Sequence, residues 1–233
     1  MDIDEKAQEL EKKIEDGQFQ AVGEELHNMS KTDRLAVAKQ IKADQQQQPS
    51  DDLPRVDFYS SGDLKSSDTL MDDTEHIHTE YDRNGKRKSE DYTNSDNDAS
   101  SHWKYDTRTG NSVSGTYRYE DGTTDHSEYN PNTGGRWRVE GDANGNVVTA
   151  KGTDGRTRKF HYDDDHKLDQ IDGHLGHWDR VDQEGKTIWV NRDTKAQWEG
   201  DFRVDSKGNL TFESGKGTDW TFTRDGQDMR KRR

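Results

Sequence analysis

Cysteine is absent from this chain of 233 residues, and proline occurs only three times. Without cysteine, the chain can form neither a disulfide nor a thiolate zinc site. Hydrophobic residues are also scarce, at 25% against 36% charged residues, a composition close to that of disordered chains. However, aromatic residues make up 9% of the chain and recur from Tyr81 to Phe222. We therefore predict a folded protein with a thin core.

Long apolar runs and large clusters of positive charge are missing as well. No stretch approaches the roughly 18 apolar residues of a membrane span, and the acidic sequence MDIDEKAQELEKK lacks the apolar region of a secretory signal. We expect a soluble protein, either cytoplasmic or exported by a route without a cleaved signal. The net charge of −14 disfavours nucleic acid and anionic membranes as partners. The basic residues at 229–233 are interpreted as a solvated tail.

Residues 1–46 have the apolar spacing of helices, and a polar segment follows them. Apolar residues recur three or four positions apart in three segments, and Ser30 to Asp33 has the pattern of a capping box that opens the third helix. We predict a small helical N-terminal region with a narrow apolar stripe that packs on another surface. Residues 47–75 are predicted to be a linker followed by one leading strand with Val56, Phe58 and Leu64.

From about residue 76 to residue 228 the period of the apolar residues becomes two, as in strands with one buried face. In AQWEGDFRV, Trp198, Phe202 and Val204 fall on one side and charged residues on the other. The same alternation occurs at Trp103 and Tyr105. We expect this segment to form a single strand, and the segments like it to form a mainly β protein.

Turn sequences separate these strands at intervals of roughly 10 to 12 residues, the spacing of short hairpins. The first residue of such a turn favours Asp and the position with positive φ favours Gly. The Asp-Gly pairs Asp121-Gly122, Asp154-Gly155 and Asp225-Gly226 are predicted to form tighter, two-residue turns. The fuller D-x-x-G form predicts structural turns at Asp82 and Gly85, Asp142 and Gly145, Asp182 and Gly185, and Asp205 and Gly208.

No single hairpin has enough apolar residues to fold alone, so the hairpins must stack side by side. We predict one continuous antiparallel β-meander, extended or curled, with a polar face and an aromatic face. The aromatic face is expected to be covered by curling of the sheet, by the N-terminal helices or by a partner.

The segment from residue 76 to residue 228 resembles the YD-repeat proteins of the rearrangement-hotspot and teneurin type. The residues that carry the resemblance are Tyr81-Asp82 with Gly85, Tyr105-Asp106 with Gly110, Tyr162-Asp163, Val181-Asp182 with Gly185, and Val204-Asp205 with Gly208. The repeats of that family form a spiralling β-sheet shell that encloses or carries a cargo domain. This chain has far fewer repeats than a closed shell needs. The resemblance therefore implies that it forms a segment of such a sheet, with a carrier or docking role.

Histidines and aspartates are the candidate metal ligands of this chain. Two histidines on one strand face make half of a zinc site, and clustered aspartates can bind calcium through oxygen. The alternative for both is ordinary polar-face and turn chemistry, and we predict no metal and no cofactor. The candidate ligands are His76, His78, His174, His177, His161 and His166 for zinc, and Asp163, Asp164, Asp165, Asp169 and Asp172 for calcium.

Four tryptophans are the candidate binding residues, because exposed rings stack on sugars and form protein interfaces. They are Trp178, Trp189, Trp198 and Trp220, with sheet core as the alternative role. We find no nucleophile elbow, zinc-protease motif or phosphate loop, so we expect no enzyme. The predicted function is a non-enzymatic β-repeat structural or interaction module with a protein partner. The alternative is a carbohydrate-binding module that uses exposed Trp and Tyr on the sheet.

Overall fold

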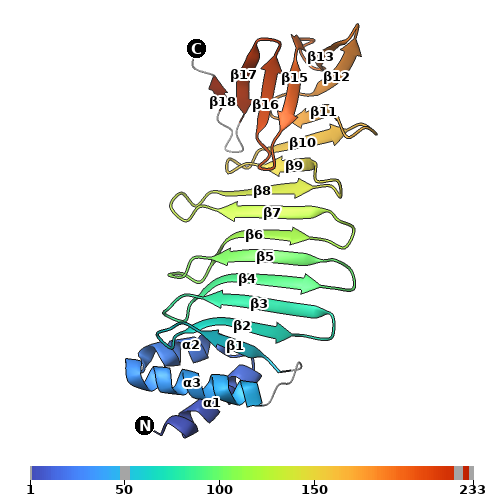
Figure 1. Cartoon of the computed structure of the whole chain (residues 1–233). Helices are drawn as coiled ribbons and strands as arrows, with labels where there is room; N and C mark the ends of the chain where they lie inside the picture. The colour runs from blue at the N-terminus through green and yellow to red at the C-terminus, as the bar shows by residue number, and fades with distance from the viewer. Residues whose placement is uncertain (1, 48–52, 223–227, 231–233) are drawn as a thin grey trace. The chain divides into compact units, whose positions relative to one another are not determined.

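The computed structural model of the chain describes residues 2–47, 53–222 and 228–230 (Figure 1). Three helices come first, and the remaining elements are strands. Residues 1–117 and residues 118–233 form two compact units. The mainly β fold with a helical N-terminal region is as predicted.

The helices are α1 (Ile3–Glu15), α2 (Phe19–Asn28) and α3 (Lys31–Gln47). The Ser30 half of the predicted capping box is confirmed, since Ser30 Oγ accepts a hydrogen bond from the Asp33 N–H at 3.2 Å. Helix α1 has Asp16 as its C-cap, and the next residue, Gly17, has a positive φ of 71° that suits a residue without Cβ. Because α3 continues to Gln47, it ends slightly later than the predicted helical region. Residues 48–52 of the predicted linker lie outside the described residues.

Two strands, not one, occupy the region predicted to hold a single leading strand, and both belong to the sheet. The strands of the first unit are β1 (Arg55–Phe58), β2 (Leu64–Leu70), β3 (Glu75–Tyr81), β4 (Arg87–Asn94), β5 (Ser100–Tyr105) and β6 (Ser112–Arg118). Those that follow are β7 (Thr124–Tyr129), β8 (Arg136–Gly141), β9 (Val147–Lys151), β10 (Thr157–Tyr162), β11 (Leu168–Gly173), β12 (Trp178–Gln183), β13 (Lys186–Asn191), β14 (Gln197–Glu199), β15 (Asp201–Val204), β16 (Leu210–Ser214), β17 (Gly217–Phe222) and β18 (Asp228–Arg230).

Strands β1 to β14 lie in sequence order in one 14-stranded antiparallel sheet, as expected for a meander. The prediction of a single continuous sheet is wrong, however, because β15 to β18 form a separate four-stranded sheet. The chain changes sheets at Gly200, so the sequence AQWEGDFRV is divided between β14 and β15. A Cβ on Gly200 would lie 2.5 Å from the Glu213 carbonyl oxygen and 2.7 Å from the Phe212 ring, so only glycine fits this crossing.

One five-residue turn recurs through the chain. The first N–H bonds to the fifth C=O, the fourth N–H bonds to the first C=O, and the fourth residue has positive φ. Where the first residue is Asp, its Oδ1 also accepts from the third and fifth N–H groups, as at Asp82, Asp142 and Asp205. Three of the four predicted D-x-x-G turns are therefore confirmed. Among the described residues, these turns are 59–63, 82–86, 119–123, 142–146, 152–156, 163–167 and 205–209.

Two turn predictions were wrong. The Asp121-Gly122 and Asp154-Gly155 pairs do not form tighter turns but occupy the third and fourth positions of the same five-residue turn. The Asp182 to Gly185 segment forms the two-residue turn instead. Glu184 and Gly185 both have positive φ there, and Gln183 pairs with Lys186. The predicted Asp225-Gly226 turn lies outside the described residues, as do residues 231–233 of the predicted tail, while Arg230 belongs to β18.

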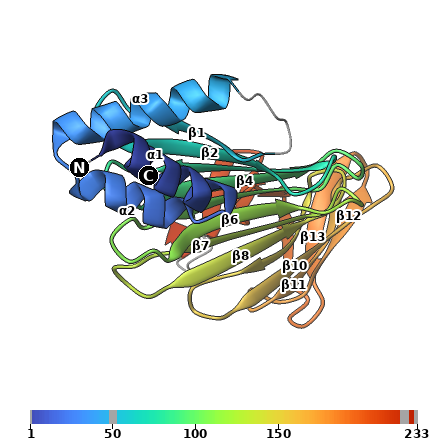
Figure 2. The ribbon, with the colours of Figure 1, turned by 90° about the horizontal axis from the view of Figure 1, so that it is seen from below.

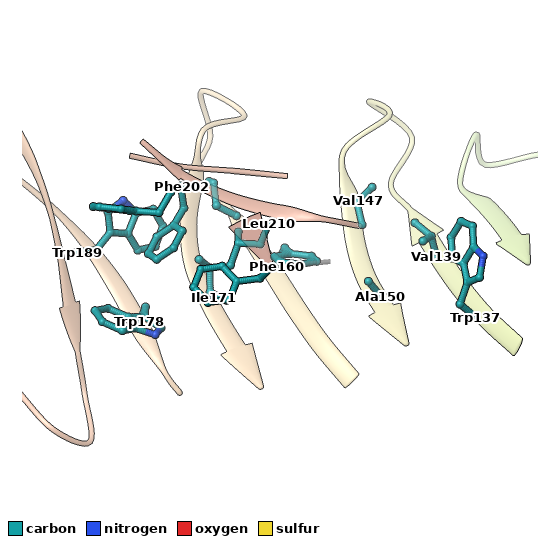
Figure 3. Close-up of a cluster of buried hydrophobic side chains, with 13 residues drawn as sticks. Trp137, Val139, Val147, Ala150, Phe160, Ile171, Trp178, Trp189, Phe202 and Leu210 are labelled. Carbon is teal, nitrogen blue, oxygen red and sulfur yellow. The ribbon is translucent and has the colours of Figure 1, made fainter. Parts of the chain in front are cut away.

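In the second unit the predicted aromatic face is covered by the small sheet, so the chain folds back on itself. Phe202 and Leu210 of the small sheet pack against Phe160, Ile171 and Trp189 of the large one (Figure 3). The ring centroids of Trp189 and Phe202 lie 5.0 Å apart in an edge-to-face contact. The complete core cluster is Trp137, Val139, Val147, Ala150, Phe160, Leu168, Ile171, Trp178, Trp189, Phe202, Leu210, Phe212 and Phe222.

In the first unit the helices form the core with the start of the sheet. Helix α2 contacts β2 and helix α3 contacts β1, and Figure 2 shows the helices beside these strands. The buried side chains of this second cluster are Ala7, Leu10, Ile14, Val22, Leu26, Val37, Ile41, Val56, Leu64 and Tyr81. The narrow apolar stripe of the helices thus packs on another surface, as predicted.

Strands β4 and β5 contain no fully buried side chain, and the same holds for β7 and β14. Both faces are only partly shielded from solvent here. Cross-strand pairs hold these strands together, including Lys88 to Glu80 at 3.2 Å and His102 to Asp91 at 2.5 Å.

Candidate functional site

The open aromatic side of β3 to β6 is the best candidate site in the first unit. Strand register places Ile77 opposite Tyr92, and Glu90 opposite Trp103, so all four project from one side of the sheet. We call the residues Tyr92, Trp103, Tyr105 and Tyr117 of this side the aromatic face. Each of the four is half-buried. Their rings therefore offer part of their surface to a ligand.

Trp103 has a distinctive position on the aromatic face. Its six-membered ring lies over Gly115 of β6, where a Cβ would overlap the ring atoms Cε3 and Cζ3. Glycine at this position lets the indole lie close to the backbone of the next strand. The Trp103 indole N–H makes no hydrogen bond within the described part of the chain and is not enclosed. Trp103 thus presents both an aromatic ring and an available donor.

Charged side chains hold the tyrosines in place. The Arg87 guanidinium lies 4.0 Å from the centre of the Tyr105 ring and 2.8 Å from Glu90. The Tyr92 hydroxyl donates to Glu75 at 2.8 Å. Burial, followed by the negative charge of Glu90, raises the pKa of Tyr105, so its hydroxyl remains a proton donor. The aromatic face therefore combines aromatic surface with carboxylates.

A groove of about 400 Å³ lies beside the aromatic face, between the sheet and the start of α2. Phe19 and Met71 contribute apolar walls, and Thr79 and Ile77 belong to its sheet side. Its volume is within the range of about 300–1,000 Å³ that is typical of ligand sites. Arg87 and Glu90 also line the groove, so it is continuous with the aromatic face.

The four tryptophans predicted to bind a ligand lie elsewhere, in the second unit. Trp178 and Trp189 are buried at 6% and 0% exposure, so neither ring is available for stacking. Trp198 and Trp220 are partly buried and pack against the same core. Sheet core, the alternative considered for these residues, is thus the role of the first pair. Ile188 and Val190, on the opposite side of β13 from Trp189, are half-buried.

Four of the six candidate metal-ligating histidines contact a single carboxylate, namely His76, His78, His161 and His177. His76 and His78 both contact Asp68, at 3.2 and 2.8 Å. His166 occupies the positive-φ position of a turn, with φ 59°. Among the described residues, no group of three or more His, Asp or Glu side chains is placed to hold a metal ion.

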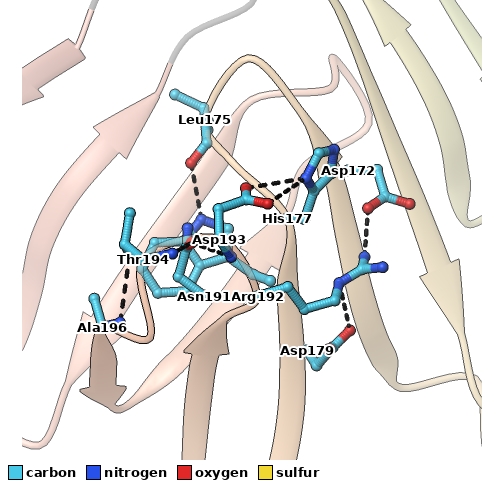
Figure 4. A network of polar contacts seen from close by, with 10 residues as sticks. Asp172, Leu175, His177, Asp179, Asn191, Arg192, Asp193, Thr194 and Ala196 are labelled. Carbon is cyan, nitrogen blue, oxygen red and sulfur yellow. Dashed lines mark hydrogen bonds and ion pairs between the residues drawn. The ribbon is translucent and has the colours of Figure 1, made fainter.

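The aspartates considered for calcium have structural contacts of two kinds. Asp163 accepts from the N–H groups of Asp165 and Lys167 in its turn, at 3.0 and 2.9 Å. Asp172 belongs to a polar network on β11 to β13, in which Arg192 contacts both Asp172 and Asp179 (Figure 4). Asp163 therefore stabilises a turn, and Asp172 takes part in an ion pair.

A shallow depression of about 500 Å³ lies over this network, lined in part by Lys159, His177 and Arg192. His177 contacts Asp193 at 3.0 Å, and Arg192 already has two carboxylate partners (Figure 4). The positive groups at this surface are thus largely compensated. The first unit therefore carries the stronger candidate site.

Sequence reasoning identified the alternation at Trp103 and Tyr105 but did not select these residues for binding. Gly115 was the available signal, because a glycine inside a strand indicates close approach of another group. No protein-family model matches the chain, and comparison with curated proteins finds no match either. Within the described residues, no helix is long and apolar enough to cross a membrane. The resemblance to YD-repeat proteins stays a prediction.

Proposed function

We propose that the protein is a non-enzymatic interaction module that binds a positively charged segment of a partner protein on the aromatic face. One observation carries this proposal. Tyr92, Trp103 and Tyr105 remain half-exposed on an open sheet, whereas Trp178 and Trp189 of the second unit are buried. Aromatic side chains of this kind are enriched at the energetic centres of protein interfaces.

Charge supports a basic partner. The chain carries a net charge of −14, and Glu75 and Glu90 contact tyrosines of the aromatic face. Aromatic rings attract cations through their negative π faces, and the Arg87 contact with Tyr105 is an internal example. Lysine or arginine side chains of a partner would find both rings and carboxylates here. Long-range attraction would also accelerate association at low salt.

The role of carrier or docking protein, which the YD-repeat resemblance implies, fits this proposal. In such a role the helices cap the first strands of the sheet and leave the aromatic face open for the cargo. The groove beside Phe19 would then receive an apolar side chain of the same partner.

Binding of a labelled lysine-rich peptide, followed by fluorescence anisotropy, tests the proposal. Trp103→Ala is expected to weaken binding by about tenfold, the scale of an interface anchor. Tyr119→Ala is the matched control, because Tyr119 is 44% exposed but lies in a turn outside the aromatic face. Equal affinity of both variants, or no binding of the peptide by the wild type, would refute the proposal.

A carbohydrate is the second candidate ligand, and the position of Trp103 over Gly115 favours it. A ring that lies against a strand offers a platform for a sugar, and the indole N–H and Asn94 add polar groups. A glycan panel distinguishes the two functions. Binding of a neutral glycan that is lost in Trp103→Ala would support this candidate, and no response across the panel would remove it.

A further inference from the structure

Strand β15 has a free edge. In the described part of the chain it pairs only with β16, at the end of the four-stranded sheet. The Asp205 N–H closes the hairpin on the Asn209 carbonyl, and hydrogen-bonded pairs alternate along an antiparallel ladder. Arg203 and Thr211 therefore form the next bonded pair. The backbone N–H and C=O groups of Phe202 and Val204 consequently point away from β16.

A groove of about 550 Å³ runs along β15. Residues 201–206 line it on one side, and side chains of the large sheet line it on the other. Val147, Tyr162 and Leu168 supply the apolar part of the second side. The Tyr162 hydroxyl already donates to the Val147 carbonyl at 3.0 Å. The free backbone groups of β15 thus adjoin a partly apolar channel.

Basic side chains outnumber carboxylates in this groove by three to two, and two of them have carboxylate partners, Lys167 with Asp165 at 3.7 Å and Arg203 with Glu213 at 3.2 Å. Lys167, Arg180 and Arg203 line it, against the two carboxylates Asp201 and Asp205. The Arg180 side chain is only 14% exposed, and its Nε and Nη2 atoms contact Asp182 at 3.2 and 3.1 Å. The Nη1 group of Arg180 has no partner among the described residues. Such a guanidinium favours a carboxylate on the ligand.

We propose that an extended acidic peptide binds in this groove as an added strand beside β15. The backbone of the peptide would bond to the N–H and C=O groups of Phe202 and Val204. Alternate side chains would point toward Val147 and Leu168, and a carboxylate would reach Arg180. This site is independent of the aromatic face, because it lies within the second unit and selects the opposite charge.

The test begins with a library of random short peptides panned on the full-length protein. The best peptide is synthesised with a fluorescent label and measured by anisotropy. Arg180→Gln is expected to weaken binding by about tenfold, as loss of a charge-assisted contact does. Val204→Pro removes an N–H at the free edge without removing a bond to β16, and a similar loss is expected. Arg138→Gln is the control, because Arg138 is exposed on β8 outside the groove.

Two N-methylated copies of the peptide keep the test decisive if Val204→Pro fails to fold. The methyl groups are placed on alternate residues, on even positions in one copy and odd positions in the other. An added strand presents one edge to β15, so only one copy should lose binding. The proposal is overturned if no peptide is selected, if both copies bind alike, or if Arg180→Gln binds as the wild type does. Selection of basic peptides, or self-association that Val204→Pro abolishes without peptide binding, would also overturn it.

Discussion

Gly23 of helix α2 and Gly85 of the turn between β3 and β4 approach so closely that a Cβ on Gly23 would lie 2.7 Å from the Gly85 Cα. Their contact places the helices directly on a turn of the sheet. A second contact reinforces it, since His27 Nδ1 lies 3.0 Å from the Arg83 carbonyl oxygen. The absence of a side chain at both positions is what permits this packing.

Substitution of Gly85 should therefore cost more than substitution of an equivalent turn glycine. Gly85→Ala and Gly145→Ala both place alanine at positive φ, at 77° and 85°, which costs about 1 kcal/mol. Nothing lies within 4 Å of a Cβ on Gly145, whereas one on Gly85 overlaps the backbone of α2. We expect an additional loss of about 1–3 kcal/mol for Gly85→Ala, measured by urea unfolding followed by circular dichroism. Equal losses would contradict the contact.

Glu11 makes the first unit pH-sensitive. Burial and then the negative charge of Asp44 raise its pKa from 4.5 to about 7. The folded state therefore binds a proton at Glu11 more tightly than the unfolded state does. This proton binding stabilises the fold fully below pH 4.5, and the stabilisation is lost as the pH rises through 7. Partial solvent exposure limits the effect to about 1 kcal/mol.

Glu11→Gln should abolish this loss of stability between pH 4.5 and 7. The measurement is the free energy of unfolding of the first unit at several pH values. Glu5→Gln, in the exposed first turn of the same helix, serves as the control and should keep the wild-type slope. An unchanged slope in Glu11→Gln would show that another group is responsible.

Two of the buried tryptophans of the second unit, Trp178 and Trp189, should respond differently to substitution by phenylalanine. Trp178 Nε1 donates to the Leu175 carbonyl at 2.9 Å, whereas Trp189 Nε1 is buried without a hydrogen-bond partner in the described residues. Trp178→Phe loses a hydrogen bond, and Trp189→Phe removes an unsatisfied donor. We expect Trp178→Phe to be the more destabilising by about 1 kcal/mol in thermal unfolding. The reverse order would mean that the volume lost at Trp189 dominates.

Adjacent aspartates provide a matched test of the recurring turn. Asp163 accepts two backbone hydrogen bonds, and Asp164 accepts none in the described structure. Asp163→Ala should cost about 1 kcal/mol, as loss of a helix cap does, and Asp164→Ala less than about 0.5 kcal/mol. Unfolding is measured with and without calcium. A calcium-dependent stability that both substitutions reduce would instead support a metal site at this turn.

Local geometry was predictable where the residues themselves dictate it. An aspartate that can bond to N–H groups two and four residues ahead, with glycine at positive φ, specifies the same turn at Asp82, Asp142 and Asp205. Asp182 departs from this pattern because its carboxylate contacts Thr187 and Arg180 and not the turn backbone. That choice depends on neighbouring strands, so the D-x-x-G pattern alone could not reveal it.

The division into two sheets could not be predicted, because alternation continues unchanged through Gly200. Trp198 and Phe202 have the spacing of one strand, yet they belong to different sheets. The candidate site was missed for a similar reason. Trp103 and Trp189 occur in similar alternating sequences. Long-range packing of Phe202 and its neighbours buries Trp189, whereas Trp103 remains half-exposed.

The packing of the small sheet on the large one also determines when the second unit can fold during synthesis. Residues 201–222 complete its core, so the apolar side of β8 to β13 remains uncovered until these later residues have been synthesised. A nascent chain at that stage displays Phe160, Ile171 and Trp189 to solvent, a state prone to aggregation. The core can close only when β15 to β17 have left the ribosome, and these apolar side chains are then covered.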